Sequence, residues 1–182
     1  MPKLIHFVHQ SADGFIAGPN GEFDWPAMGP ELSDHAQASE ATTEAFLYGR
    51  VVWEMMVGFW PKAEEISDHP HTTRYAPIWR RKPKVVVSRT LTSADWNTRV
   101  VSSVADVATL KASLSGDLIL FGGSSLAGAL TAAGLIDEYQ IFVHPVVLGG
   151  GKPVFEPTPR FGLDLVESRV LDSAVVQLRY TR

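Results

Sequence analysis

Short apolar runs separated by glycine and proline dominate the hydrophobic pattern of this chain. Such runs, rich in β-branched residues, are typical of strands that are buried on both faces of a sheet. They predict strands at residues 3–9, 44–48, 84–88, 117–121 and 138–147. Two further strands, 163–171 and 174–181, meet at Asp172–Ser173 and are expected to form an antiparallel hairpin.

Stretches of helical character separate most of these strands and predict helices at 31–45, 50–57 and 124–133. A further helix is predicted near 106–114, because apolar residues recur there at helical spacing after Asp106, which suits an N-cap. Residues 11–21 are expected to be a loop. The prolines in 58–83 predict a loop with one short helix at most.

The alternation of strands and helices predicts an α/β fold. Its central sheet should be mostly parallel, with helices on both faces and the C-terminal hairpin as an antiparallel edge. The chain shows no internal repeat and no linker, so we expect one domain over residues 1–182.

Composition removes several classes of function. The net charge of −4 argues against a general nucleic-acid binder, and the absence of cysteine excludes disulfides, thiol nucleophiles and thiolate metal sites. No apolar stretch approaches the length of a membrane span, and the first apolar run is short and interrupted by His6. We therefore expect a cytoplasmic protein that binds neither membrane nor nucleic acid. His69 and His71 are expected to be solvated, which leaves no metal site.

Candidate chemistry gathers where two predicted strands run through glycine into a helix, at Gly49–Arg50 and at Gly122–Gly123–Ser124. The first N–H groups of a helix are unpaired and partially positive, and glycine lets a ligand approach them closely. Two such junctions at one sheet edge would hold the pyrophosphate of a dinucleotide. Tight turns of this kind also occur without any ligand, and neither segment is a GxGxxG fingerprint.

Two arginines favour the ligand-binding alternative. Arg50 opens a helix, where its charge opposes the helix dipole, so an anionic partner would explain its position. Ser88 and Arg89 place a second basic group at a strand end, where open α/β sheets bind ligands. The alternative is that both arginines are solvated surface residues.

Six motifs in order carry a resemblance to a known family. They are S-x-D-G-F-I-A at 11–17, L-Y-G-R-x-x-W-E at 47–54, V-V-S-R at 86–89, F-G-G-S-S-L at 121–126, G-L-I-D-E at 134–138 and H-P-V-V-L-G-G-G-K-P-V-F at 144–155. Together they resemble the C-terminal reductase domain of bacterial riboflavin-biosynthesis deaminase-reductases and its stand-alone relatives, within the dihydrofolate-reductase-like superfamily. The resemblance covers nearly the whole chain and implies the three-layer fold of that superfamily.

This resemblance implies an NADPH-dependent reductase that transfers a hydride to a small heterocyclic or ribosylaminopyrimidine-type substrate. It places the nucleotide phosphates at 49–52, the ribose 2′-phosphate at 88–89, the pyrophosphate and nicotinamide side at 122–126, and the nicotinamide ring against 16–17. The implied cofactor-binding residues are Ile16, Ala17, Gly49, Arg50, Val51, Val52, Ser88, Arg89, Gly122, Gly123, Ser124, Ser125 and Leu126. The family resemblance and the hairpin edge, which needs cover, both point to a homodimer.

Catalytic and substrate-binding candidates come from the remaining polar and aromatic residues. Asp13 near the substrate is the candidate proton donor, which would need a raised pKa; an ordered water is the alternative, and Asp13 can instead bond its own loop. Trp25, Asp34 and Arg81 are the candidates for substrate binding. Trp25 could equally pack in the core or a lid, and Arg81 could belong to a solvated basic stretch.

The chain departs from dihydrofolate reductases in two places. Those enzymes carry threonine where Val52 stands, and they place a pterin-binding acid on the first long helix, where Glu31 and Asp34 match only loosely. We therefore expect weak or absent reduction of dihydrofolate. Two other hypotheses stay open: a catalytically silent nucleotide-binding protein on the same fold, and a partner-binding module without a small-molecule site.

Overall fold

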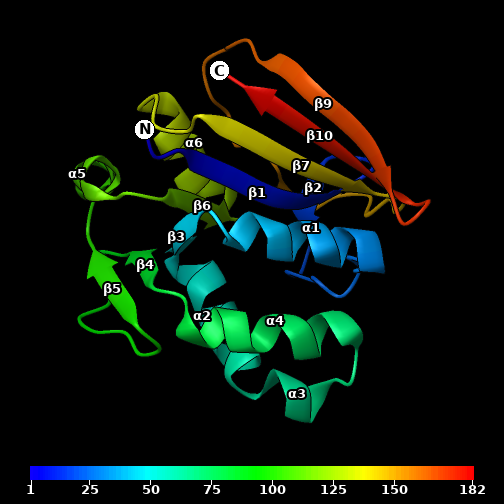
Figure 1. The fold of residues 1–182 in the computed structure, drawn as a ribbon. Coiled ribbons are helices and arrows are strands. Elements are labelled where there is room, and N and C mark those ends of the chain that lie inside the picture. The colour runs from blue at the N-terminus through cyan, green and yellow to red at the C-terminus, as the bar shows by residue number, and fades with distance from the viewer.

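The computed structural model describes residues 1–182 and contains an eight-stranded sheet with strand order β5-β4-β3-β6-β1-β7-β10-β9 (Figure 1). Its strands are β1 Leu4–Ser11, β3 Thr43–Gly49, β4 Lys84–Val87, β5 Thr98–Val101, β6 Asp117–Phe121, β7 Glu138–His144, β9 Asp164–Leu171 and β10 Val175–Thr181. The neighbours from β5 to β7 are parallel, whereas β10 is antiparallel to both β7 and β9. The α/β class, the mostly parallel sheet and the C-terminal hairpin are confirmed.

Helices cover both faces of this sheet, which gives three layers (Figure 1). They are α1 Pro30–Glu40, α2 Arg50–Phe59, the 3-10 helix η1 Trp60–Lys62, α3 Ala63–Ile66, α4 Pro70–Arg81, α5 Val104–Ser113 and α6 Ser124–Ala132. Side chains of α1, α2 and α4 enter one buried cluster, and those of α5 and α6 enter the other. Along β1, Leu4 and Val8 belong to one cluster and Ile5 and Phe7 to the other, which explains why apolar residues occur on both faces of this strand.

The segment 58–83 corrects the sequence prediction most strongly. It holds the end of α2, η1, α3 and the 12-residue helix α4, where a loop with one short helix was expected. Tyr75 and Trp79 are buried against the sheet at helical spacing, so tertiary packing stabilises the helix. Pro70 lies in the first turn, where its missing N–H is harmless, and the interior Pro77 is tolerated.

Several other boundaries also differ from the prediction. The first helix ends at Glu40 instead of 45, because residues 43–45 already pair with β6. Helix α5 begins at Val104 with Ser103 as its N-cap, and Asp106 is the third helical residue of a capping box. Strand β5 had not been predicted, and the short paired strands β2 Phe15–Ala17 and β8 Lys152–Pro153 lie in predicted loops. No helix in the structure is both long and apolar enough to cross a membrane.

The C-terminal hairpin turns where the sequence predicted, and its turn also caps a helix. Asp172 and Ser173 both have φ of 54°, and the Ala174 N–H donates to the Leu171 carbonyl at 3.0 Å, which closes a tight turn with positive φ at both central residues. The Asp172 carboxylate accepts hydrogen bonds from the N–H groups of Glu31 (2.8 Å) and Leu32 (3.1 Å) at the start of α1. This contact joins the hairpin to the helix layer.

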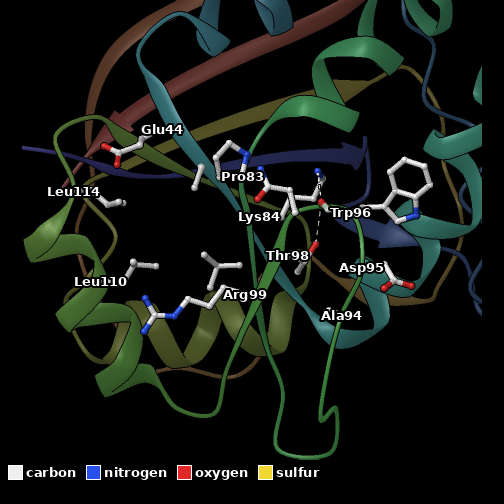
Figure 2. A pocket seen from close by; sticks show the side chains of 13 residues that line it. Glu44, Pro83, Lys84, Ala94, Asp95, Trp96, Thr98, Arg99, Leu110 and Leu114 are labelled. Atoms are coloured by element: carbon white, nitrogen blue, oxygen red, sulfur yellow. Dashed lines mark hydrogen bonds between the residues drawn. The ribbon is translucent and has the colours of Figure 1, made fainter.

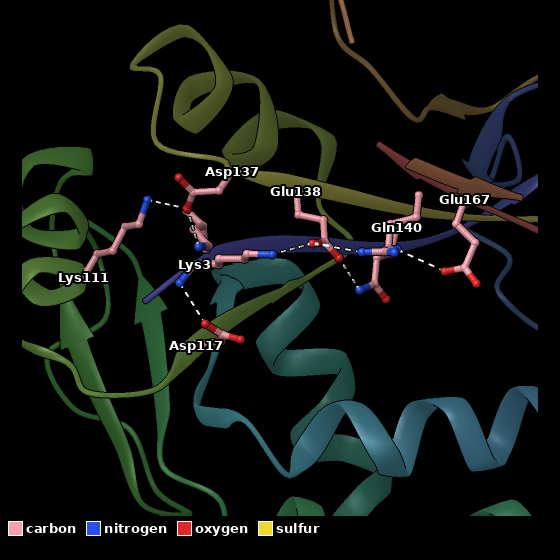
Figure 3. A network of polar contacts seen from close by, with 9 residues as sticks. Lys3, Lys111, Asp117, Asp137, Glu138, Gln140 and Glu167 are labelled. Carbon is pink, nitrogen blue, oxygen red and sulfur yellow. Dashed lines mark hydrogen bonds and ion pairs between the residues drawn. The ribbon is translucent and has the colours of Figure 1, made fainter. Parts of the chain in front are cut away.

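A polar network ties together the amino ends of β1, β6 and β7 (Figure 3). The Lys3 backbone N–H donates to Asp117 at 2.8 Å, and the Lys3 ammonium lies 3.0 Å from the buried carboxylate of Glu138. Lys111 of α5 forms an ion pair with Asp137 at 2.5 Å. These contacts anchor the amino edge of the sheet, and the candidate site lies at the opposite, carboxyl edge.

Candidate functional site

The site is organised by two strand–glycine–helix junctions on neighbouring strands. Strand β3 leads through Gly49 into α2, and β6 leads through Gly122 and Gly123 into α6. Strands β3 and β6 are parallel, with Leu47 opposite Leu120, so both helices begin at the same edge. The prediction that the two junctions share one sheet edge is therefore confirmed. Neither helix has a side-chain cap, which leaves the N–H groups of its first turn free.

The glycines bring the two helix starts into contact. Gly122 and Gly123 have φ of 55° and 70°, a left-handed conformation that other residues rarely adopt. A Cβ added at Gly123 would lie 3.6 Å from Val52 of α2, and one added at Gly49 would lie 3.7 Å from Leu126 of α6. Each helix start thus packs against the first turn of the other, with exposed backbone between them.

A cavity of about 920 Å³ opens beside these helix starts. Its walls come from β1, the first two turns of α2, the β6–α6 junction and two loops, 16–23 and 151–152. The lining is largely apolar and includes Phe7, Met55 and Phe121. Arg50 and Lys152 carry its only charges, and no carboxylate lines it. The electrostatics therefore favour an anionic ligand.

Most of the predicted cofactor residues line this one cavity. They are Ile16, Ala17, Gly49, Arg50, Val51, Val52, Gly122, Gly123, Ser125 and Leu126. Arg50 forms an ion pair with Glu54 one turn along α2, at 3.0 Å, and this pair partly offsets the unfavourable charge at the helix start. Ser124 lies at the same junction but is buried away from the cavity, and its hydroxyl has no hydrogen-bond partner.

Ser88 and Arg89 lie next to this cavity, at the end of β4. Val87 lines the large cavity, whereas Ser88 and the exposed Arg89 line a neighbouring one of about 530 Å³ together with Arg99. The Ser88 hydroxyl accepts hydrogen bonds from the N–H groups of the following turn, including that of Leu91 at 3.1 Å. Arg89, Arg99 and the carboxylate of Asp106 line this smaller cavity, so cations outnumber anions there.

The carboxylate of Asp13 bonds to its own loops. It accepts hydrogen bonds from the Ser11 hydroxyl (2.6 Å) and from the N–H groups of Leu148 (3.1 Å) and Gly149 (2.8 Å). The Ser11 hydrogen bond is the main cause that lowers the pKa of Asp13; desolvation opposes it, and the bonds from the Leu148 and Gly149 N–H groups add to the lowering. Asp13 does not line the cavity. This geometry favours the loop-bonding alternative over the proton-donor role.

The substrate-binding candidates do not reach the cavity. Asp34 forms an exposed ion pair with Arg74 at 2.8 Å, and Arg81 pairs with Glu40 at 3.2 Å. Trp25 donates its indole N–H to a backbone carbonyl within its own loop, and its ring packs edge-on against the His144 ring, with 5.5 Å between centroids. The lid-packing alternative therefore describes the position of Trp25.

A further cavity of about 460 Å³ lies at the amino ends of β4 and β5 (Figure 2). At its base Lys84 is buried, donates to the carbonyls of Lys82 and Trp96, and lies 4.1 Å from the centre of the Trp79 ring. Burial lowers the pKa of Lys84 to about 8. Ligands of open α/β sheets bind at the carboxyl ends of strands, so this cavity is not the candidate site.

Sequence reasoning missed several residues of the main cavity. His9 of β1 lines it, as do Pro19 and Phe23 of the loop after β2 and Lys152 of β8. The strand alternation that places Phe7 on one face also places His9 there, which was the available signal. No local sequence pattern indicates that Pro19, Phe23 and Lys152 line the cavity, because only the β2–β8 pairing brings residues 15–17 and 152–153 together.

The chain matches the RibD C-terminal domain family over residues 2–177. It belongs to this family. Among curated relatives, the RibD C-terminal domain protein described here is 36% identical to the uncharacterized protein YyaP of Bacillus subtilis (strain 168), over 98% of this chain and 94% of YyaP. It is 27% identical to YwjB of the same organism, over 99% of this chain and 98% of YwjB.

Solved structures confirm the dihydrofolate-reductase-like fold of this family member. A protein of Shewanella sp. PV-4 assigned to riboflavin biosynthesis is 24% identical, with a TM-score of 0.76 over 99% of this chain and 98% of that one. Dihydrofolate reductase from Enterococcus faecalis, complexed with NADP(H) and RAB-propyl, is 18% identical, with a TM-score of 0.67 over 99% and 96%. Acinetobacter baumannii RibD is 18% identical, with a TM-score of 0.69, and this chain covers 58% of it. Family and fold together are of the reductase type.

Proposed function

We propose that this protein is an NADPH-dependent oxidoreductase that reduces a small heterocyclic substrate. The observation that carries the proposal is the pair of uncapped helix starts at one cavity whose only charged lining residues are Arg50 and Lys152. Two helix dipoles and two cations suit an elongated anionic ligand such as a dinucleotide, whose phosphates would compete with the carboxylates that pair with these cations, Glu54 with Arg50 at 3.0 Å and Glu156 with Lys152 at 3.3 Å.

The residues present fit such a cofactor. The free N–H groups at 50–52 and 124–126 are suited to phosphate oxygens, and Gly122 and Gly123 leave no side chain between them. Ile16, Ala17 and Leu126 offer an apolar wall for a nicotinamide ring. The cavity volume of about 920 Å³ lies near the upper end of the roughly 300–1,000 Å³ that is common for small-molecule sites.

When bound, NADPH supplies the hydride, so the chain itself has to bind, align and exclude water. The segment 16–23 forms part of the cavity wall and is held in place by the β2–β8 pairing. A Cβ at Gly151 would lie only 2.1 Å from the carbonyl oxygen of Ala17, so the two loops pack backbone against backbone. Asp13 holds the adjoining loop 148–149. These contacts hold the segments 16–23 and 148–151 in place beside the cavity before any ligand binds.

NADPH binding, followed by fluorescence titration, tests the proposal with a matched pair of variants. Arg50 and Arg74 are 46% and 48% exposed, and each forms an ion pair from a helix, with Glu54 and Asp34 respectively. Arg50 lines the cavity and Arg74 does not. We expect Arg50→Gln to weaken NADPH binding by about tenfold, through loss of a charge-assisted hydrogen bond, and Arg74→Gln to leave it unchanged. Absent binding by the wild type, or equal losses in both variants, would contradict the proposal.

A catalytically silent nucleotide-binding protein is the second candidate. The observation that favours it is the surface ion pair of Asp34 with Arg74, because it leaves the cavity without an acid that could bind a pterin. NADPH oxidation measured against a panel of pyrimidine and pterin compounds separates the two functions. Turnover of any compound supports the reductase, whereas NADPH binding without turnover supports the silent protein.

A further inference from the structure

Two histidines from different strands form a hydrogen-bonded pair at the wall of the cavity. His9 of β1 and His144 of β7 lie on adjacent parallel strands, and His9 Nδ1 is 2.9 Å from His144 Nε2. On its other side, His144 Nδ1 accepts the backbone N–H of Ala27 at 3.3 Å. His144 is 1% exposed and is covered by the Trp25 ring.

These hydrogen bonds set the tautomer of both rings. A backbone N–H can only donate, so His144 Nδ1 is the bare nitrogen and His144 Nε2 carries the proton. That proton is donated to His9 Nδ1, which leaves the proton of His9 on Nε2. The order of donors from Ala27 through His144 to His9 thus leaves one N–H group at the end.

The Nε2–H of His9 is this last donor, and no carboxylate lines the cavity beside it. His9 lines the cavity, and its Nε2 makes no hydrogen bond within the protein. Burial, aided by the nearby charges of His144 and His71, lowers the pKa of His9 to about 3, and burial lowers that of His144 to about 4. Both rings are therefore neutral at pH 7, so each has one nitrogen that donates and one that accepts a hydrogen bond.

We propose that His9 is the specificity-determining donor of this site, held by His144 as a positioning residue, and that it selects a substrate presenting an acceptor oxygen such as a ring carbonyl. A carboxylate at this wall would instead select a cationic or donor-rich ring. The pair is not a path for protons, because it ends at the Ala27 amide, which cannot supply one. This inference rests on the proposed reductase function for the identity of the site.

Nitrogen-15 NMR of the histidine side chains tests the positioning step without any ligand. We expect His9 and His144 both to be neutral Nε2–H tautomers at pH 7. His144→Phe should leave His9 as a mixture of tautomers, and His144→Gln, which keeps an N–H donor, should restore the Nε2–H form. An Nδ1–H tautomer of His9 in the wild type, or one unaffected by His144→Phe, overturns the positioning role.

Two probes of equal shape test the selectivity, with NADPH present and by ligand-observed NMR. 2-Pyridone offers a carbonyl oxygen, and 2-aminopyridine offers an amino group in its place. We expect the wild type to bind 2-pyridone more tightly than 2-aminopyridine. His9→Leu should bind 2-pyridone about fivefold more weakly, because one hydrogen bond is missing, whereas His9→Gln should retain most of the affinity for 2-pyridone. His9→Asp should bind 2-aminopyridine more tightly than 2-pyridone.

The outcomes separate this inference from the proposed function. If the wild type binds NADPH but does not bind 2-pyridone, or if His9→Leu binds both probes as the wild type does, the selectivity inference is wrong and the reductase proposal stands. If NADPH does not bind, the proposed function fails, while the tautomer measurement still decides whether His144 orients His9.

Discussion

Two glycines that flank helix α6 allow the proposed phosphate-binding role of its N-terminus to be tested separately from backbone strain. Gly123 is the N-cap of α6 with φ of 70°, and it lines the cavity. Gly134 follows the other end of the same helix with φ of 68° and does not line that cavity. Alanine at either position must adopt a left-handed conformation, but only Gly123→Ala places a methyl group at the helix start that faces the ligand.

The structure gives the expected size of both effects. A Cβ at Gly123 would be 3.6 Å from Val52, an ordinary contact, and a Cβ at Gly134 would meet nothing within 4 Å. Neither variant therefore adds a clash, and each should lose about 1–2 kcal/mol of unfolding free energy from the left-handed conformation alone. For a chain of this size, that corresponds to a melting-temperature decrease of about 2–4 °C per kcal/mol.

The cofactor affinity should change in one variant only. If the methyl of Gly123→Ala blocks one charge-assisted hydrogen bond to phosphate, of about 1.5–3 kcal/mol, NADPH binding weakens by a factor of about 10 to 150. Thermal melts without ligand and fluorescence titrations with NADPH measure the two quantities. Equal NADPH affinity in Gly123→Ala and Gly134→Ala would refute the assignment of this junction as the phosphate cradle.

Three further predictions concern cofactor choice, pH and assembly. We expect at least about a tenfold preference for NADPH over NADH, since each charge-assisted hydrogen bond to the 2′-phosphate contributes about 1.5–3 kcal/mol. The ratio of the specificity constant for NADPH to that for NADH should be smaller in Arg89→Ala than in the wild type. An unchanged ratio would show that Arg89 does not bind the 2′-phosphate. Burial lowers the pKa of both His6 and His144 to about 4 from 6.5, so the unfolded chain takes up protons first as the pH falls. The unfolding free energy should be full above pH 6.5 and smaller by about 2 kcal/mol for each histidine at pH 5; equal urea midpoints at pH 7 and pH 5 would count against this. The exposed edge strand β9, with Val170 at 65% exposure, predicts a homodimer that Val170→Glu converts to a monomer; a wild-type mass of 19.9 kDa at all concentrations in light scattering contradicts it.

Local sequence signals predicted the parts of the fold that depend on local chemistry. Five strands of the parallel sheet were predicted from their apolar runs, and the hairpin turn was located at Asp172–Ser173, where both residues adopt positive φ. Helix α4 was missed because its prolines suggest a loop, whereas Tyr75 and Trp79 form a helix by packing against the sheet. Propensity is a weak guide where burial decides.

The candidate site was predicted in part for the same reason. Gly49 and Gly122–Gly123 were identified because a strand that runs through glycine into a helix has a recognisable local pattern. Asp13 was assigned to catalysis by its motif, but its carboxylate bonds to loop 148–149, more than 130 residues away in the chain. A sequence motif identifies a candidate residue, but only the tertiary structure shows which groups its side chain contacts.

The sequence by itself therefore determined the α/β class, the two glycine junctions and the turn of the hairpin, because each depends on residues within one strand, helix or turn. Tertiary structure alone decided that β3 lies beside β6, that segment 16–23 lines the cavity, and that His9 meets His144. These outcomes depend on strand order and long-range register, which arise from burying two faces of one sheet at once. No short window of sequence contains that information.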